Sequence, residues 1–142
     1  MENRDGLIWF DGEFVDWKNA NIHILNHGLH YASSVFEGER SYSGKIFKVR
    51  EHTERLFNSA DALDLKIPYS VDQIIDASYQ SLKLNNLENA YIRPIVWRGS
   101  EMGVSAPDAQ VHCAIAVWEW PSYFTPEEIL KGIKVTLSEW KR

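Results

Sequence analysis

The order of strand-like and helix-like segments is the feature of this sequence that most constrains its fold. Strand patterns come first, in two pairs with a turn in the middle of each, at residues 7–17 and 35–49. Helix patterns follow at residues 50–64 and 71–84, and two longer strand patterns lie at residues 90–98 and 110–120. Because strands and helices do not alternate, the sequence predicts an α+β fold, a mainly antiparallel sheet with two flanking helices, rather than a doubly wound parallel sheet.

Turn and cap residues support these segments. Asp11-Gly12 and Ser43-Gly44 are typical of tight turns between paired strands. Ser70 is a good N-cap, and the residues after it come close to a capping box at the start of the second helix. Pro94 interrupts a strand pattern, which predicts an edge position or a bulge for that strand.

Length and composition limit the class of protein. With 142 residues, of which 44% are hydrophobic, the chain can bury a core as one domain or as one domain with a tail. The net charge of -5 argues against a nucleic-acid or membrane-surface partner. No apolar run approaches the about 20 residues of a membrane span, and no apolar signal segment stands at the start, so we expect a cytoplasmic protein. The single cysteine, Cys113, excludes a disulfide within the chain and is expected to be buried.

Several kinds of chemistry lack their residue patterns. His27 and His30 are three residues apart, but no carboxylate or thiol stands at a suitable spacing, so no metal site is expected. Neither a nucleophile elbow nor a Gly-rich phosphate loop is found. Glu37 and Glu39 belong to one predicted strand, and we expect them to point to opposite faces and not to form a catalytic carboxylate pair.

An anion site is one interpretation of the first helix. His52 and Arg55 are three residues apart and lie on nearly the same face of its first turns. A helix N-terminus favours an anion, and an arginine adds a two-point contact to a phosphate. The alternative is a solvent-exposed helix face with a pair between Glu51 and Arg55, and the residues alone favour this alternative.

A second group of residues is suited to a small carboxylate. It consists of Tyr31, Phe36, Tyr91, Arg93 and Tyr123. In a strand, Tyr91 and Arg93 point to one face and Ile92 to the other. An arginine beside aromatic rings suits a carboxylate held in an apolar pocket, although each tyrosine alone is more often part of a core or rim.

The sequence also resembles a known family. The matching segments are residues 27–31 (HGLHY), 35–42 (VFEGERSY), 50–56 (REHTERL) and 90–94 (AYIRP), followed by Gly99 and residues 102–104. With these segments in order over nearly its whole length, the chain resembles the fold-type IV pyridoxal-phosphate transaminases, and most closely the branched-chain amino-acid aminotransferases. It departs from the family pattern at Ala32, where glycine is common, and at Glu39, where an apolar residue is more usual.

The resemblance implies roles for single residues. Arg55 matches the arginine that binds the phosphate of pyridoxal 5′-phosphate. Tyr31, Phe36 and Tyr123 match residues that line the pocket for the substrate side chain. Gly38 and Arg40 match positions near the substrate, and Tyr91 and Arg93 match the tyrosine and arginine near its carboxylate.

The implied reaction moves an amino group between leucine, isoleucine or valine and 2-oxoglutarate. Residues 91–94 (YIRP) favour this group of enzymes over the D-amino-acid transaminases and the aminodeoxychorismate-lyase relatives, which stay as alternatives. A further alternative from a different class is a module without catalysis that associates with itself through its Trp and Phe side chains.

The resemblance also implies that the chain is an N-terminal part. Residues 1–120 correspond to a small domain, and residues 121–142 to a linker and the first strand of a larger domain. Within the latter range, Thr125 as N-cap and Pro126 at the first position predict a short helix. The Schiff-base lysine is expected beyond Arg142, so no catalytic residue is expected within the chain and the chain alone should be inactive. The family further implies a homodimer or higher oligomer in which residues 27–31 approach the partner subunit.

Overall fold

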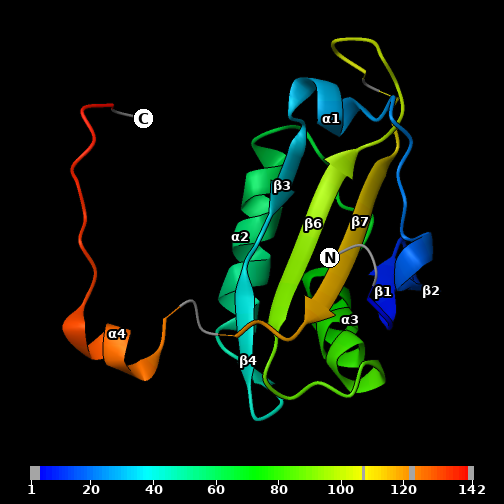
Figure 1. Ribbon diagram of the computed structural model, residues 1–142. Helices are drawn as coiled ribbons and strands as arrows, with labels where there is room; N and C mark the ends of the chain where they lie inside the picture. Colours follow the sequence, from blue (N-terminus) through cyan, green and yellow to red (C-terminus); the bar gives the residue numbers. More distant parts are fainter. Residues whose placement is uncertain (1–3, 107, 122–123, 141–142) are drawn as a thin grey trace.

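An antiparallel sheet forms the centre of the protein. The computed structural model describes residues 4–106, 108–121 and 124–140, and in these residues seven strands form one sheet in the order β2-β1-β7-β6-β4-β5, with β3 also paired to β6. Figure 1 shows α2 and α3 lying side by side against one face of this sheet, and the expected α+β fold with two flanking helices is confirmed. The strands are β1 (Leu7–Phe10), β2 (Glu13–Asp16), β3 (Ser34–Phe36), β4 (Glu39–Tyr42), β5 (Lys45–Ile46), β6 (Tyr91–Arg98) and β7 (Val111–Trp118). The helices are α1 (His27–Tyr31), α2 (Val49–Asp61), α3 (Val71–Leu84) and α4 (Pro126–Lys131), with a 3-10 turn at Trp17–Asn19.

Both predicted hairpins form. In the first, Phe10 pairs with Glu13, and Asp11 and Gly12 both adopt positive φ angles, of 48° and 97°. The second joins β4 to β5 through Ser43 and Gly44, again both with positive φ. Two consecutive positive φ angles match the right-handed twist of the flanking strands, which is why these residue pairs predict the turns correctly.

The two long helices bury one stripe each against the sheet. Leu56 and Ala60 of α2 and Ile74 of α3 are fully buried in a core with Ile92 of β6 and Ile115 of β7. The predicted cap at Ser70 is a complete capping box with Gln73, which fixes the start of α3. Helix α2 ends at Asp61, three residues before the end predicted at residue 64.

The prediction of an edge strand or bulge around Pro94 is wrong. Strand β6 lies inside the sheet, with β7 on one side and β3 and β4 on the other. The pairs Phe36–Ile95 and Glu39–Ile92 belong to one continuous register, so no residue is inserted. The Glu37 N–H donates to the carbonyl oxygen of Pro94 at 3.0 Å, and Pro94 has no N–H to donate in return. The ladder is therefore interrupted at Glu37 and Gly38, which divides the strand expected at residues 35–42 into β3 and β4.

The sheet has one covered and one open face. Along β6, Ile92 and Val96 point into the core under the helices, whereas Arg93, Ile95 and Trp97 point to the open face. This alternation is the period of two that a strand imposes. The open face carries a smaller apolar cluster and the hollows described below.

In the C-terminal part of the described chain, the expected short helix forms and the expected strand does not. The short helix forms as α4, with Thr125 and Glu128 in a capping box, and Figure 1 shows it apart from the sheet. Residues 133–140 are not a strand: they lie along no described strand, and Ile133, Val135 and Trp140 are exposed. An apolar, alternating sequence becomes a strand only where a neighbouring strand pairs with it.

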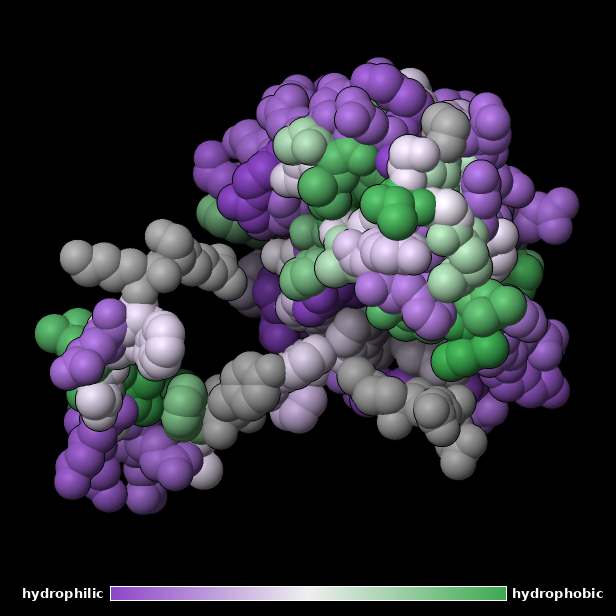
Figure 2. All heavy atoms as spheres, turned by 90° about the horizontal axis from the view of Figure 1, so that it is seen from above, coloured by the Kyte–Doolittle hydropathy of each residue, from purple (hydrophilic) through white to green (hydrophobic). Residues whose placement is uncertain are grey.

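Large apolar side chains are also exposed at the end of the molecule that carries α1. Figure 2 looks onto this end and shows hydrophobic residues at its surface. They include Ile24, Leu25 and Leu29, and Val104 of the loop after β6. In the described ranges, no helix is long and apolar enough to cross a membrane.

Candidate functional site

The interruption between β3 and β4 holds a carboxylate against α2. Both oxygens of Glu37 accept hydrogen bonds of 2.6 Å from Arg55, one from Nε and one from Nη2, and Glu37 Oε2 lies 2.9 Å from His52 Nδ1. The Glu37 side chain is only 5% exposed. Burial by itself raises the pKa of Glu37, but the hydrogen bonds and charges of Arg55 and His52 together lower this pKa below its usual value.

Arg55 is thereby oriented with part of its guanidinium group still accessible. Its side chain is 65% exposed, and Glu37 occupies the edge formed by Nε and Nη2. A guanidinium group has more N–H donors than this contact uses, and Nη1, which takes no part in it, can donate to a further acceptor. The pair expected as the alternative does not form, because Glu51 bonds to Lys48 at 3.0 Å instead of to Arg55.

On the open face, an arginine lies among aromatic rings. The Arg93 Nη2 group donates to Tyr91 Oη at 2.6 Å, and the Arg93 guanidinium carbon lies 4.2 Å from the centre of the Phe36 ring. Tyr91 and Arg93 share this face and Ile92 is fully buried on the other, as their alternation predicts. Phe36 precedes the interruption, so its ring reaches Arg93 from the neighbouring strand.

Gly38 is required by the position of Tyr91. A Cβ atom at residue 38 would clash with Tyr91 Oη and lie 3.2 Å from ring carbon Cζ. The glycine therefore lets the tyrosine hydroxyl rest against the interrupted backbone and accept the bond from Arg93. This brings Phe36, Gly38, Tyr91 and Arg93 of the predicted site together.

A cavity of about 490 Å³ adjoins these residues. Arg40 also contributes to it and donates from Nη1 to the carbonyl oxygen of Trp120 at 3.0 Å. The cavity is lined by Arg40, Tyr42, Tyr91, Arg93, Trp120, Pro121 and Phe124. Two guanidinium groups among aromatic rings suit a small molecule with a carboxylate and an apolar part.

Tyr31 lies elsewhere, and Tyr123 lies outside the described residues. Tyr31, at the end of α1, donates to the carbonyl oxygen of Met102 at 3.3 Å and packs its ring 4.4 Å from that of His27. It lines a separate hollow of about 380 Å³ with Val104 and Arg98. The structure does not bring Tyr31 to Arg93 within one copy of the chain.

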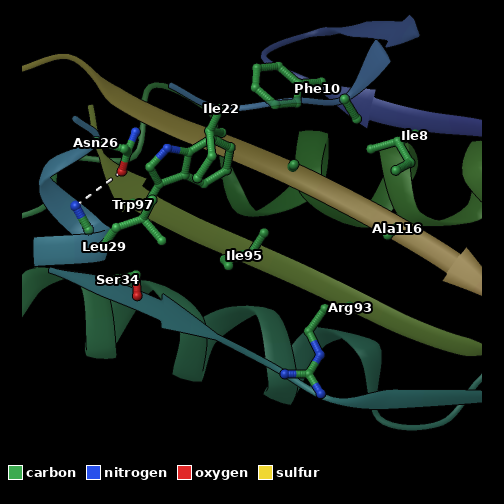
Figure 3. Close-up of a pocket in the computed structure, with 13 residues that line it drawn as sticks. Ile8, Phe10, Ile22, Asn26, Leu29, Ser34, Arg93, Ile95, Trp97 and Ala116 are labelled. Atoms are coloured by element: carbon green, nitrogen blue, oxygen red, sulfur yellow. Dashed lines mark hydrogen bonds between the residues drawn. The ribbon is translucent and has the colours of Figure 1, made fainter. Parts of the chain in front are cut away.

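An apolar groove continues along the open face from Arg93. It measures about 300 Å³, and Figure 3 shows Ile95 and Trp97 of β6 along its floor, with Arg93 at one end. Phe10 of β1 and Ile22 of the segment between the 3-10 turn and α1 lie on its other side. The sequence did not predict this groove, because its residues come from segments far apart in the chain. The alternation of side chains along β6 was the one available signal, since it places Arg93, Ile95 and Trp97 on the same face.

Sequence reasoning also missed the role of Glu37 and gave Glu37 and Glu39 the wrong geometry. Both side chains lie on the helix-covered face, because residues two apart in a strand point the same way. Glu37 pairs with Arg55, whereas Glu39 is fully buried. No group of three His, Cys, Asp or Glu side chains suited to a metal ion occurs within the described ranges.

Comparison with known proteins agrees with the resemblance seen in the sequence. Residues 34–142 match the family model described as amino-transferase class IV. The chain is 48% identical to the branched-chain-amino-acid aminotransferase of Pseudomonas aeruginosa over all of its own length and 48% of the relative. It is 38% identical to the enzyme of the same name from Escherichia coli, over 95% of this chain and 46% of the relative.

Solved structures give the same result. A crystal structure of the Escherichia coli branched-chain amino acid aminotransferase superposes with a TM-score of 0.79 at 38% identity, covering 82% of this chain and 41% of that one. The branched-chain aminotransferase of Thermoproteus uzoniensis, solved with norvaline, also has a TM-score of 0.79, at 29% identity over 84% of this chain and 42% of that one. The chain spans about half the length of the curated relatives it matches. By sequence and by fold, this chain belongs to the class IV aminotransferase family.

Proposed function

We propose that this chain is the N-terminal part of a pyridoxal-phosphate-dependent transaminase that moves the amino group between leucine, isoleucine or valine and 2-oxoglutarate. The observation that carries the proposal is the placement of two arginines on opposite sides of one interrupted strand. Arg55 lies on the helix side, held by Glu37, and Arg93 lies on the open side, held by Tyr91. Relatives named branched-chain-amino-acid aminotransferases support the reaction class.

The residues present fit the phosphate of the cofactor. Arg55 offers an accessible guanidinium edge whose orientation is fixed by a buried carboxylate, which is the arrangement that a two-point phosphate contact needs. A structural neighbour with pyridoxamine 5′-phosphate supports the choice of cofactor. When bound, pyridoxal phosphate supplies the carbonyl carbon that takes up the amino group and a ring that withdraws electrons.

On the open side, the residues bind and orient the substrate. Arg93 and Tyr91 lie where they can hold a carboxylate, and the Phe36 ring offers an apolar surface beside them. Arg40 brings a second positive charge to the same cavity. An apolar site next to arginines accepts either an aliphatic or an acidic side chain, as transamination between leucine and 2-oxoglutarate requires.

The catalytic lysine belongs, in this proposal, to the half of the protein outside these 142 residues. Residues 1–120 form the small domain, and residues 121–142 lead into the larger one. The chain alone therefore binds and orients but does not transaminate. Borohydride reduction of the 142-residue chain with pyridoxal phosphate should trap no specific lysine adduct; a specific adduct would contradict the absence of the catalytic lysine.

We further propose that Tyr31 serves the site of a second copy in a homodimer or higher oligomer. Its hydroxyl is anchored to the loop after β6, at Met102, and large apolar side chains are exposed around it. This arrangement accounts for its distance from Arg93 within one copy, and Tyr123 completes the side-chain pocket in the same proposal.

The full-length protein tests the function directly. Transfer from L-leucine to 2-oxoglutarate, followed as glutamate formation, should be far faster than transfer from D-alanine. The opposite preference would favour the D-amino-acid transaminases. Absence of any transfer with cofactor present would favour the non-catalytic alternative.

A further inference from the structure

Glu39 is a buried carboxyl group that the proposed function leaves unexplained. Its side chain is 1% exposed, and neither oxygen has a hydrogen-bond partner among the described residues. It stands on β4 opposite Ile92, on the face covered by the helices. Buried polar groups are nearly always hydrogen-bonded, so an unpartnered carboxyl group calls for an explanation.

The charge state of Glu39 follows from its surroundings. Burial raises the pKa of Glu39 to about 8, with a further contribution from the negative charge of Glu37. Glu39 is therefore mainly a neutral acid at pH 7, whereas Glu37 is ionised. Two carboxyl groups two residues apart on one face thus carry a single negative charge.

Among the described residues, few charged groups lie near Glu39 on the helix-covered face; Arg40 and Arg93 line the cavity on the open face. From α2, His52 and Arg55 bond to Glu37. The α3 residues that are buried carry no charge: Ile74, Ala77, Ser78, Ser81 and Leu82. On the same face of β7, the Cys113 thiol has a pKa raised by burial to about 12 and is neutral. Ionisation of Glu39 would therefore add a second carboxylate beside Glu37, which is already paired with Arg55.

We propose that Glu39 is a positioning residue that sets the strength of the anion site at Arg55. While neutral, it leaves Glu37 as the one carboxylate acting on the guanidinium group; once ionised, its charge opposes an anion bound there. The proposal rests on the proposed role of Arg55 toward the cofactor phosphate. By Coulomb's law at an effective dielectric constant of about 20, one added charge close to such a site changes anion affinity by about tenfold.

The test measures anion affinity without catalysis. The full-length protein, freed of cofactor, is titrated calorimetrically with pyridoxine 5′-phosphate, which carries the phosphate but has no aldehyde to react with a lysine. Between about pH 7 and about pH 9.5, we expect the wild-type affinity to fall about tenfold more than that of Glu39→Gln, which stays neutral. Because both proteins are titrated with the same probe, a difference between their slopes of affinity against pH comes from the protein and not from the probe.

Glu54→Gln is the matched control. Glu54 is an exposed carboxylate on α2, next to Arg55 in sequence, and its charge is screened by solvent. This variant should follow the wild-type pH profile. If Glu54→Gln lost as much of the pH dependence of affinity as Glu39→Gln, this pH dependence could not be assigned to Glu39.

The remaining outcomes separate the two proposals. Parallel pH profiles of Glu39→Gln and the wild type would overturn the role of Glu39. Unchanged affinity of Arg55→Ala at pH 7 would instead overturn the proposed role of Arg55. If Glu39→Gln does not fold, Glu39→Leu gives the same comparison with an uncharged side chain. A purely structural role would lower affinity equally at every pH and leave the slope unchanged.

Discussion

Glu37 and Arg55 form a two-point ion pair that joins the interrupted strand to α2, with both N···O distances at 2.6 Å. The carboxylate is buried and the guanidinium group is largely exposed. The pair therefore works as an orienting contact: the buried partner fixes the direction of the exposed one. Fixing a guanidinium group before an anion arrives removes part of the entropy that binding would otherwise lose.

Replacing Arg55 should weaken cofactor binding. In the full-length protein, Arg55→Ala removes a charge-assisted contact to phosphate and should lower affinity by about 2 kcal/mol, roughly thirtyfold. Arg50→Ala is the matched control, because Arg50 also lies on α2 but pairs at the surface with Asp72. Equal cofactor affinities in the two variants, measured by fluorescence titration, would refute the role of Arg55.

Replacing Glu37 should destabilise the protein in a pH-dependent way. Because folding lowers the pKa of Glu37 from 4.5, its ionised form stabilises the folded state above about pH 4.5. This contribution is lost as the pH falls through the lowered pKa. Glu37→Gln should therefore unfold more easily by about 1–2 kcal/mol at pH 7. The difference from the wild type should disappear in acid, near pH 2, and urea unfolding at both pH values checks this.

Replacing Glu39 should change the free energy of unfolding in the opposite direction. Its pKa rises from 4.5 to about 8 on folding, so the folded state binds the proton more tightly than the unfolded state. The contribution of Glu39 to stability is then greatest below about pH 4.5 and falls by about 1.4 kcal/mol per pH unit until about pH 8. Glu39→Gln lacks this titration and should be more stable than the wild type above pH 8. If the melting temperature of Glu39→Gln does not rise relative to that of the wild type between pH 5 and pH 9, then Glu39 is not protonated in the folded state as expected.

Local signals predicted most of the fold. The Asp11-Gly12 turn and the Ser70 cap depend on residues next to one another, and the structure has both where the sequence places them. The prediction at Pro94 fails because the missing N–H of a proline can face an interruption in the neighbouring strand as well as a free edge. The strand prediction for residues 133–140 fails for a similar reason, since a local pattern does not say which other strand will pair with the segment.

The candidate site was predictable only in its parts. The alternation along β6 correctly places Tyr91 and Arg93 on one face. The partner of Arg55 was not predictable from helix spacing, which suggested Glu51, because the observed partner Glu37 comes from a strand. Long-range pairing of this kind depends on the register between β3, β4 and β6, which no local pattern contains.

Replacing Gly38 should impair substrate binding through Tyr91. In Gly38→Ala the new Cβ atom displaces the Tyr91 ring, which breaks the 2.6 Å bond from Arg93 and moves the proposed carboxylate contact. Losing one such contact costs about 1.5–3 kcal/mol, so kcat/KM for L-leucine should fall roughly ten- to hundredfold. Gly44→Ala is the control: its Cβ atom meets nothing within 4 Å, and its φ of 75° costs about 1 kcal/mol of stability without touching the site. Equal kcat/KM values for the two variants would mean that the Tyr91–Arg93 contact does not orient the substrate.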